Sequence, residues 1–435
     1  MKKKIAIFWF RRDLRIEDNA GLYYALKSGL DVIPIFIFDK NILDSLENKE
    51  DRRVDFIHQC LENLQKEFLK YQSTLLVFHS SPSLAFEELT KKFEVEEVYT
   101  NHDYEPYAMQ RDQKISDFLK SKGIIFKTFK DQVIFERSEV VKADGKPYTV
   151  FTPFSKVWKQ KLSDDHLKSF TSEKLLGNLH KHKYISFPSL SEIGFLKTDL
   201  NAPSINANEE IIRHYEDKRN FPFLEGTTRL GIHLRFGTIS VRKLARKARS
   251  LNEQFLNELI WREFFMAILF HFPHVVTQSF KKEYDNIDWR RDESDFKKWC
   301  RGETGYPIVD AGMRQLNETG WMHNRVRMIV ASFLTKHLLI DWRMGEAYFA
   351  EKLIDYELSA NNGNWQWAAS TGCDAAPYFR IFNPSEQVKK FDPDLKYIKN
   401  WVKDLEEISY PQPIVDHKFA RERALKTYKL GLQRI

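Results

Sequence analysis

The strongest constraint on the fold is a change of periodicity along the chain. Up to about residue 130, short runs of β-branched and aromatic residues alternate with segments in which apolar residues recur at helical spacing. The runs predict strands at Ile5–Phe10, Val32–Phe38, Thr74–Phe78, Glu97–Asn101 and Ile124–Phe129. Strands that alternate with helices in this way are typical of a parallel, doubly wound sheet, so an α/β fold is expected for this region.

The first turn of this region lacks the signature of a main nucleotide site. The first strand leads into RRDLRIEDN and not into the glycine-rich GxGxxG turn that holds a dinucleotide phosphate. Between the second and third strands, Asp51–Tyr71 carries apolar residues at helical spacing and predicts a long covering helix. The crevice at the carboxyl ends of the strands can still hold a second ligand.

Beyond residue 130 the pattern changes twice. Residues 131–204 show weak periodicity and a Pro-, Ser- and Lys-rich tract, so we expect an interdomain linker with a helix or two inside it. From residue 205 the strand signal vanishes, and helices are predicted at Asn208–Lys218, Ser240–Ser250, Asn252–Phe270, Tyr306–Glu318, Trp321–Leu339 and Gly345–Asp355. The expected organisation is an α/β domain at 1–130, the linker at 131–204 and an all-helical domain at 205–435. A length of 435 residues agrees with two or three domains.

Composition bounds the environment and the partners of the chain. No run approaches the ~20 apolar residues of a membrane span, and the apolar stretch near the start is too short for a signal sequence. Cys60, Cys300 and Cys373 are scattered and form no CxxC pair, so we expect a reducing cytoplasm, no iron–sulfur cluster and no metal site. The net charge is +7, and from residue 201 onward 36 Lys and Arg stand against 31 Asp and Glu. This mild bias permits nucleic acid as a partner without demanding it.

The most unusual stretch is Trp321–Pro384. It holds four of the ten tryptophans and a cluster of three amides, Asn361, Asn362 and Asn364. Such side chains are costly to bury unless their polar atoms find partners. Aromatic walls with amides at the rim suit a large planar guest with polar edges; an aromatic-rich helical core with a polar surface is an equal alternative. Trp365 and Trp367 would project differently from one helix, so one can face inward and the other a cavity mouth.

Two shorter motifs precede this stretch. Gly226–Gly231 (GTTRLG) places hydroxyls, an Arg and glycines before a helical segment, where they can surround a phosphate or form a plain capped loop. On a helix Glu258, Trp261 and Arg262 share one face. They form either a surface ion pair or, because the indole lies between them, a surface that receives something flat.

A further helical stripe is expected at the start of the unusual stretch. Its members lie at i, i+3, i+4 and i+7: Trp321, Asn324, Arg325 and Met328. Arg327 points away from this stripe and, if buried, needs a carboxylate or a phosphate. Asp355 and Glu357 are the candidate carboxylates. Met328 taken alone also fits as ordinary core filling.

Several segments together resemble a known family. They are RRDLRIEDN, EGTTRL, NELIWREF, TGYPIVDAGMRQL, TGWMHNRVRM, DWRMGEAYF and NNGNWQWAASTGCDAAPYFRIFNP, and they resemble the photolyase/cryptochrome family, most closely class I cyclobutane pyrimidine dimer photolyases. The resemblance runs from about Phe8 to the end of the chain and is most specific in the last third. It implies an enzyme, a carbon–carbon lyase for light-dependent DNA repair, in which reduced FAD transfers an electron to a flipped-out cyclobutane pyrimidine dimer and splits it. A cryptochrome-type blue-light receptor without repair activity is the alternative.

The resemblance also implies which residues contact FAD. They are Tyr215, Thr227, Thr228, Arg229, Leu230, Gly231, Phe255, Arg262, Arg327, Asp355, Glu357 and Asn361. Arg327 and Asp355 match an ion pair beside the flavin rings, and Asn361 matches the amide that faces flavin N5. Repair enzymes carry Asn at that position, whereas plant receptors usually carry Asp and insect receptors Cys. Two positions depart from the family pattern, because Phe255 replaces a common Trp and Glu357 a common Asp.

The lesion contacts that the resemblance implies are Glu258, Trp261, Asn324, Met328 and Trp367. Glu258 matches an acid that donates to a pyrimidine carbonyl, so it must be protonated, and burial against Trp261 would favour that state. Relatives that repair the (6-4) lesion carry His where this chain has Asn324 and Met328, which favours the cyclobutane dimer. Arg219, Arg325 and Arg380 resemble phosphate anchors on DNA.

The remaining expectations concern electron transfer, a second chromophore and the partners. Trp289, Trp342 and Trp365 resemble the tryptophan relay that reduces the flavin from the protein surface. Glu105 resembles an acidic antenna contact, and folate, deazaflavin, flavin and no antenna all stay open. The expected partner is double-stranded DNA containing pyrimidine dimers. The protein is expected to be a monomer without membrane contact.

Overall fold

The computed structural model describes residues 3–433, and within them the chain forms two compact units. The sheet unit comprises residues 3–136, Lys161–Asn206 and Arg229–Lys247. The helical unit comprises Arg137–Gln160, Ala207–Thr228 and residues 248–433. The chain therefore passes between the units several times, and residues 131–204 are shared between them. The domain boundaries expected from the sequence stay a prediction.

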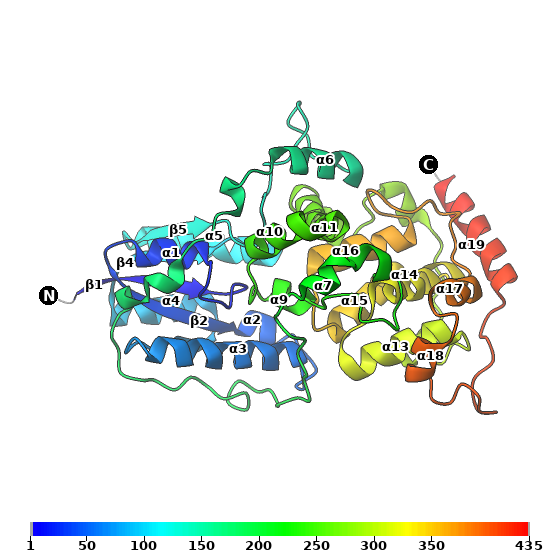
Figure 1. The fold of residues 1–435 in the computed structure, drawn as a ribbon, viewed down its shortest axis with the longest axis horizontal. Helices are drawn as coiled ribbons and strands as arrows, with labels where there is room; N and C mark the ends of the chain where they lie inside the picture. The colour runs from blue at the N-terminus through cyan, green and yellow to red at the C-terminus, as the bar shows by residue number, and fades with distance from the viewer. Residues whose placement is uncertain (1–2, 434–435) are drawn as a thin grey trace. The chain divides into compact units, whose positions relative to one another are not determined.

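The sheet unit is built on parallel strands. Within residues 3–433 the sheet has five of them, β1 (Lys4–Phe10), β2 (Asp31–Asp39), β3 (Leu76–Ser80), β4 (Glu94–Asn101) and β5 (Ile125–Phe129), in the order β3-β2-β1-β4-β5 (Figure 1). The predicted α/β fold class and all five predicted strands are confirmed. The bounds differ by up to three residues, most at the start of β4.

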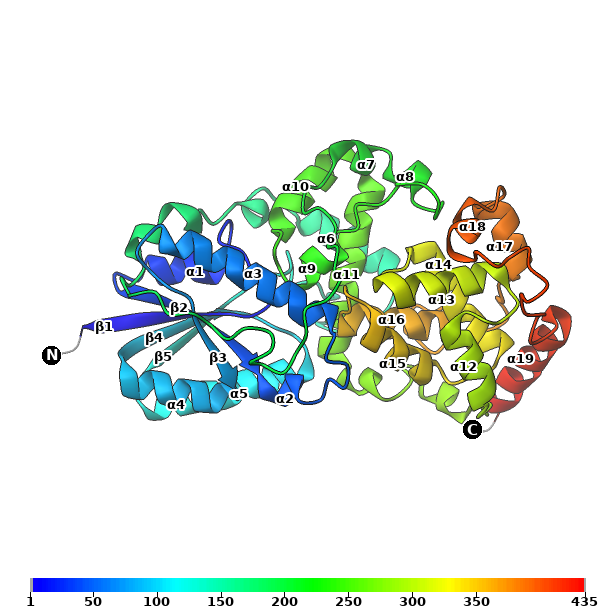
Figure 2. The same ribbon diagram turned by 90° about the horizontal axis from the view of Figure 1, so that it is seen from below.

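Helices cover both faces of this sheet, and Figure 2 shows α1 (Ala20–Leu26) and α3 (Arg52–Leu69) on one face and α4 (Pro82–Lys92) and α5 (Pro106–Ser121) on the other. β1 is buried along its length after Lys4, which explains why its sequence is one apolar run and not an alternation. β2 follows β1 on one side and β4 lies on the other, so the chain order reverses beside β1. In such sheets, ligands bind outside the carboxyl ends of the strands at this point.

The remaining elements of the sheet unit are short. They include α2 (Lys40–Leu43), α9 (Gly231–Arg235) and the single turns Asp165–Leu167, Ser172–Lys174 and Leu176–Asn178. α10 (Val241–Leu251) begins in this unit, and the amide of Lys243 donates to Ser240 Oγ over 3.1 Å, so the predicted helix cap at Ser240 is confirmed.

The helical unit contains the longest apolar helix and several that pack around it. Its helices are α6 (Phe151–Lys161, without its last residue), α7 (Glu209–Arg213), α8 (Tyr215–Lys218), α11 (Glu253–His271), α12 (Glu293–Arg301), α13 (Pro307–Thr319), α14 (Asn324–Ser332), α15 (Trp342–Lys352), α16 (Leu358–Ala369), α17 (Pro384–Phe391), α18 (Lys396–Trp401) and α19 (His417–Leu432). The short turns Pro273–Val276 and Lys282–Asn286 join α11 to α12. The all-helical character expected for the second half is confirmed.

Two predicted helices are wrong in detail. The helix predicted at Asn208–Lys218 is two short helices, because His214 leaves helical geometry after α7. The helix predicted at Trp321–Leu339 begins only at Asn324, where the His323 side chain caps it by accepting from the Arg325 amide over 3.1 Å. Trp321 therefore lies outside the helix and not on the predicted stripe. The helix ends in a π-helical turn at Phe333–His337.

Close approach of helices brings the unusual stretch together. α16 packs against both α11 and α15, and at each contact a glycine faces an aromatic ring. A Cβ on Gly363 would lie 2.1 Å from Phe265 of α11, and a Cβ on Gly345 would lie 2.2 Å from Trp365 of α16. Only glycine leaves room for these rings, so the two positions set how near α16 lies to its neighbours.

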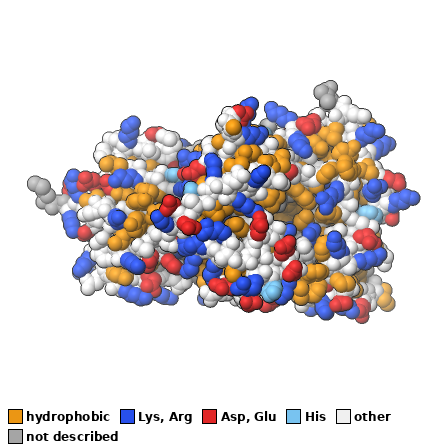
Figure 3. All heavy atoms as spheres, turned by 45° about the horizontal axis from the view of Figure 1, so that its top comes forward, with side chains coloured by type: hydrophobic (Ala, Val, Ile, Leu, Met, Phe, Trp, Pro, Cys, Tyr) orange, Lys and Arg blue, Asp and Glu red, His pale blue; other side chains and the backbone are white. Residues whose placement is uncertain are grey.

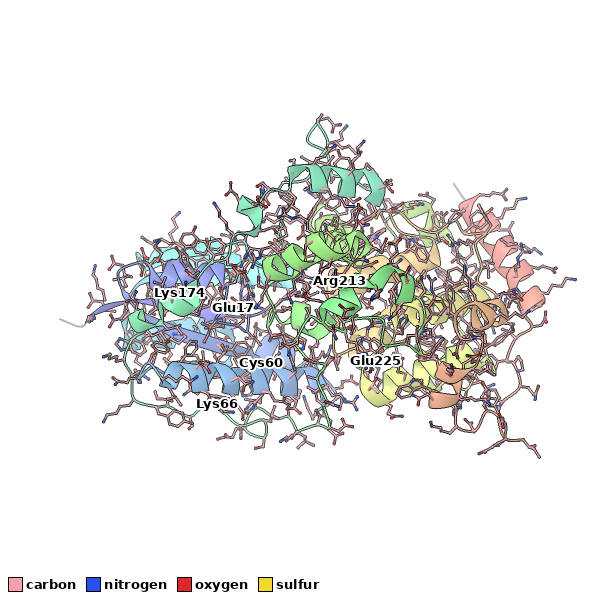
Figure 4. The ribbon with its side chains drawn as sticks, in the orientation of Figure 1. Glu17, Cys60, Lys66, Lys174, Arg213 and Glu225 are labelled. Carbon is pink, nitrogen blue, oxygen red and sulfur yellow. The ribbon has the colours of Figure 1, made fainter. Side chains whose placement is uncertain are left out.

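The cysteines are free and separate in this fold. Cys60 lies on α3 (Figure 4), and burial raises the pKa of its thiol to about 12. Burial likewise raises the pKa of Cys300 and Cys373 to about 12, so all three are poor nucleophiles at neutral pH. Across residues 3–433, we find no helix with both the length and the apolar character needed to span a bilayer.

Replacing Gly363 by Ala is expected to lower the melting temperature of the protein by about 1–2 °C. The new methyl group collides with the buried Phe265 ring, and overpacking of this kind costs about 1–3 kcal/mol, more than the roughly 1 kcal/mol that Ala gains over Gly in a helix. Thermal unfolding followed by circular dichroism measures the shift. Gly177→Ala is the control, because nothing lies within 4 Å of its Cβ position; an equal or higher melting temperature for Gly363→Ala would contradict the packing argument.

Candidate active site

A hollow in the helical unit gathers many of the predicted site residues. It is walled by α14, α15, α16 and the segment before α16, and it holds about 610 Å³ of free space, its open mouth included. The predicted site residues that line it are Asn324, Arg327, Met328, Asp355, Glu357, Asn361, Trp365 and Trp367. Figure 3 shows a recess over the helical unit with hydrophobic side chains at its walls and charged side chains of both signs on the surface around it.

The lining combines rings, amides and one ion pair. Phe349, Tyr356, Trp365 and Trp367 supply aromatic surface, while Asn324, Asn361 and Asn364 supply amides. Trp365 is buried and Trp367 half-buried, so the two tryptophans of α16 differ in exposure as the sequence predicts. Of the two interpretations of this stretch, the cavity with aromatic walls and polar groups is the one that the structure supports.

The ion pair in this lining joins α14 to the segment before α16. Arg327 Nη2 donates to both oxygens of Asp355 over 2.9 and 3.2 Å, and its Nε donates to the Met322 carbonyl oxygen over 2.8 Å. Of the two candidate carboxylates, Asp355 is therefore the one that pairs with Arg327. The guanidinium is held by three hydrogen bonds, which fixes a positive charge in the cavity wall.

Asn361 is held by a second carboxyl group. Its Nδ2 donates to the backbone oxygen of Glu346 over 3.1 Å and to Glu346 Oε1 over 2.8 Å. Burial raises the pKa of Glu346, although the hydrogen bond from Asn361 acts in the opposite direction. These bonds orient the amide of Asn361 in the cavity wall. Glu346 was not singled out in the sequence, where it stands within DWRMGEAYF without any periodic or motif signal of its own.

A second group of predicted residues lies along α11. Arg262 Nε donates to Glu357 Oε2 over 3.1 Å, and their side chains are only 10% and 7% exposed, so this ion pair links α11 to the cavity wall. Nearer the start of α11, the ring of Phe255 meets Tyr215 of α8 edge-on at 5.1 Å. The two residues that differ from the family pattern therefore each have a clear partner: Phe255 contacts Tyr215, and Glu357 pairs with Arg262.

Glu258 has surroundings different from those expected. Its carboxylate pairs with Arg219 and accepts from Gln254 Nε2 over 2.9 Å, and its side chain is 32% exposed. Trp261 instead stacks on Phe151 of α6. The expected burial of Glu258 against the indole is therefore not found, because the carboxylate is half-exposed and paired with the guanidinium of Arg219. The sequence could not reveal Phe151, which stands 110 positions earlier in the chain.

The three predicted phosphate anchors lie close enough to influence one another. Arg325 Nη2 donates to Asn220 Oδ1 over 2.6 Å, and its guanidinium lies 4.3 Å from the centre of the Phe391 ring. Burial lowers the pKa of Arg325, and the positive charges of Arg219 and Arg380 lower it further. Three guanidiniums are thus concentrated beside the cavity, since Arg325 follows directly after Asn324.

The tryptophans of the predicted relay extend away from the cavity. Trp365 lines it, Trp342 is buried in the same hydrophobic core, and Trp289 packs against that core while half-exposed. Among residues 3–433, the indole nitrogen of Trp342 has no hydrogen-bond partner. From Trp365 through Trp342 to Trp289, the three indoles pass from buried to half-exposed positions, and their role as a relay stays a prediction.

The GTTRLG segment spans the boundary between the two units. Figure 4 labels Glu225, directly before it, and Arg213 at the end of α7. Thr227 and Thr228 belong to the helical unit, whereas Arg229, Leu230 and Gly231 belong to the sheet unit, in which Gly231 begins α9. Arg229 adopts a left-handed backbone (φ 52°). A Cβ on Gly226 would lie 2.7 Å from the Lys218 carbonyl oxygen, so this tight turn requires glycine.

The predicted antenna contact lies in the sheet unit. Glu105 Oε1 accepts from Arg12 Nη1 over 3.1 Å and from Arg235 Nη1 over 2.6 Å. Arg12 also pairs with Asp103 over 3.1 Å, and the positive charges around Asp103 hold the pKa of its carboxyl well below its usual range. Any ligand that uses Glu105 would share it with two guanidiniums. Among residues 3–433, no group of His, Cys, Asp and Glu side chains is arranged to hold a metal ion.

Comparison with known proteins places this fold and site in a family. A family model described as the FAD binding domain of DNA photolyase matches residues 255–409, and a model described as DNA photolyase matches residues 6–172. The chain belongs to the DNA photolyase family. It is 36% identical to the deoxyribodipyrimidine photo-lyase of Halobacterium salinarum, over 97% of this chain and 98% of that protein.

Solved structures agree with this assignment. A class III photolyase from Agrobacterium tumefaciens superposes with a TM-score of 0.88 at 34% identity, covering 99% of this chain and 98% of the other. The archaeal photolyase from Sulfolobus tokodaii superposes with a TM-score of 0.80 at 36% identity, covering 98% of this chain and 99% of the other. It was solved with two FAD molecules, with the implication of a novel light-harvesting cofactor.

The residues of the helical unit fit the FAD that the family model implies. The cavity offers rings to a flat molecule, and its wall carries the fixed charge of Arg327 and the oriented amide of Asn361. Aromatic walls with a few fixed polar groups suit a large planar ligand with polar edges, which is the form of a flavin.

Replacing Glu346 by Gln is expected to stabilise the protein increasingly as the pH rises above ~4.3, the ordinary pKa of a glutamate. The folded-state pKa of Glu346 is raised, so between the ordinary value and the raised one the folded state binds more protons than the unfolded state, and the free energy of unfolding falls with pH. Gln keeps an acceptor for Asn361 and cannot ionise. Melting temperatures of both proteins across pH 4 to 8 test this.

Glu351→Gln on the same helix is the matched control, since its carboxylate is more than half exposed. A Glu346→Gln variant whose melting temperature differs from the wild type by the same amount at every pH would rule out a raised pKa of Glu346 in the folded state.

Proposed function

We propose that this protein repairs DNA in the light by splitting cyclobutane pyrimidine dimers. The observation that carries this proposal is the cavity of the helical unit, whose lining joins residues predicted for the flavin with residues predicted for the lesion. The names of its relatives support repair over the alternative of a blue-light receptor. When bound and reduced, FAD would supply the electron that opens the cyclobutane ring and would take it back afterwards.

The chain's own contribution at the flavin is to hold and orient it. Arg327 would present a fixed positive charge to the ring system, and Asp355 keeps that guanidinium in place by its ion pair. Asn361 would offer its amide to the flavin edge in the orientation that Glu346 imposes. Because an amide does not ionise near neutral pH, Asn361 would neither give the flavin a proton nor take one from it.

At the lesion, the proposed roles are shape recognition and hydrogen bonding. Trp261 and Trp367 would form aromatic walls for the extruded pair of bases, and stacking on such rings stabilises unpaired bases. Asn324 would donate to a base edge, and Met328 would give an apolar contact. Glu258 would donate to a pyrimidine carbonyl oxygen. That role requires Arg219 to leave the carboxylate, which a DNA phosphate would favour by attracting the guanidinium.

We further propose duplex DNA as the substrate, a monomeric protein and a cytoplasmic location. The concentration of Arg219, Arg325 and Arg380 supports a phosphate-binding surface, because like charges this close repel until an anion lies between them. Three free cysteines suit a reducing compartment. Trp365, Trp342 and Trp289 would carry an electron from the surface to an oxidised flavin, a role that rests on the family resemblance.

The repair reaction itself is the direct test. Purified protein loaded with FAD and chemically reduced is illuminated with near-ultraviolet or blue light in the presence of a duplex that contains one thymine dimer. We expect the dimer to revert to two thymines, as measured by chromatography of the digested DNA, and no reversion in the dark. Dimers left intact under light, by protein whose reduced flavin is verified by absorbance, would refute the proposal.

Replacing Arg325 or Arg380 by Ala is expected to weaken binding to damaged and undamaged duplexes alike. Each substitution removes a guanidinium from a DNA phosphate, so the slope of log K against log salt should become shallower by about 1. Fluorescence anisotropy at several salt concentrations measures both effects. Arg301→Ala is the control, since Arg301 is exposed on α12 and pairs with Glu303; unchanged slopes for Arg325→Ala and Arg380→Ala would remove both residues from the DNA surface.

A further inference from the structure

Helix α6 is part of the helical unit, although in the chain it follows soon after the last strand of the sheet. Figures 1 and 2 both draw it beside α11. Trp158 is buried, and its Nε1 donates to Glu263 Oε2 over 2.5 Å. Phe154 packs on Phe264 with ring centres 5.3 Å apart, and Lys159 pairs with Glu253. These contacts run along much of α11, so α6 is packed firmly against that helix.

The first residue of α6 covers one face of Trp261. The rings of Phe151 and Trp261 are nearly parallel, with centres 3.7 Å apart and planes 4° apart. Phe264 meets both rings edge-on, at 5.9 and 5.6 Å. Free aromatic pairs prefer offset or edge-on arrangements to face-to-face stacking. The fully stacked geometry is therefore imposed by the two helices that carry the rings.

The backbone of Phe151 is anchored as well. Its amide donates to Asp374 Oδ2 over 3.0 Å. Asp374 lies in the segment between α16, which carries Trp367, and α17, and Arg380 follows in the same segment. The backbone of Phe151 is thus held from two sides, by its own helix on α11 and by the segment after α16. Its ring is held by the parallel contact with Trp261 and the edge-on contact with Phe264.

We propose that Phe151 is a positioning residue for lesion recognition, which acts by holding the indole of Trp261 in one orientation. Trp261 lies one helical turn after Glu258, so fixing its ring also fixes the aromatic wall relative to the carboxyl group of Glu258. If the Trp261 side chain is ordered before binding, the complex does not lose the conformational entropy of that side chain when the lesion binds. The inference rests on the proposed function, in which Trp261 contacts the lesion.

The test compares three variants of Phe151 in the full-length, FAD-loaded protein. Phe151→Ala removes the stacked ring, Phe151→Leu keeps an apolar side chain without a flat face, and Phe151→Tyr keeps the ring. Lys159→Ala is the matched control on α6, because it breaks a surface contact with α11 far from the indole. Dissociation constants are measured for a duplex with one thymine dimer and for the same duplex undamaged.

We expect Phe151→Ala to weaken binding of the damaged duplex by roughly two- to tenfold, as for removal of one aromatic pair, with undamaged duplex bound as by the wild type. Phe151→Leu should lose a smaller part of this preference, and Phe151→Tyr and Lys159→Ala should retain it. Equal weakening for both duplexes, no weakening, or tighter binding by Phe151→Ala would overturn the proposal; tighter binding would mean that Phe151 blocks the lesion site.

A second measurement separates this inference from the proposed function. In protein labelled with fluorinated tryptophan, the Trp261 resonance is assigned from its disappearance in Trp261→Phe. We expect this resonance to shift and broaden in Phe151→Ala and Phe151→Leu and to stay narrow in Phe151→Tyr. An unchanged resonance in Phe151→Ala would refute the positioning role whatever the repair activity. A wild-type protein that neither prefers nor repairs the damaged duplex would refute the proposed function instead.

Discussion

The close approach of α16 to its neighbours is the constraint on which the site depends. Gly363 lets the ring of Phe265 on α11 reach the backbone of α16, and Gly345 of α15 does the same for Trp365. Because α16 carries Asn361, Trp365 and Trp367, this spacing decides where an amide and two indoles stand in the cavity wall. A wider spacing would separate Asn361 from Glu346 and Arg262 from Glu357. The cavity wall would then lose the two contacts that tie it to α15 and α11.

The buried charges follow a common rule. Arg327 lies against Asp355 and Arg262 against Glu357, so each of these two guanidiniums has its own carboxylate. Glu346 has no such cation and is held instead by an amide, and burial raises its pKa. Within residues 3–433, the positive charges that remain without a carboxylate in this region are those of Arg325 and Arg380, outside the cavity wall. DNA phosphates could neutralise them there.

The sequence predicts those parts of the protein that leave a local pattern. The five strands and the helices α3, α11 and α13 are recovered because their apolar residues repeat along the chain. The site residues proposed in the last third come instead from whole segments that resemble a family, and their roles stay predictions. Trp321 is misplaced, since the His323 side chain starts the helix later than the apolar spacing implies. Glu346, Phe151 and Asp374 have no local signal at all, because their roles arise only where segments distant in the chain meet.

Because α6 belongs to the helical unit, truncations and chimeras of this protein must keep it with that unit. A fragment that starts after the connection, at residue 205, would discard the indole that bonds Glu263 and the ring that lies on Trp261. Glu263, which is buried, would lose that donor, and Trp261 would gain a bare face. Chimeras with relatives should therefore treat residues 137–160 and the helices after residue 248 as one inherited block.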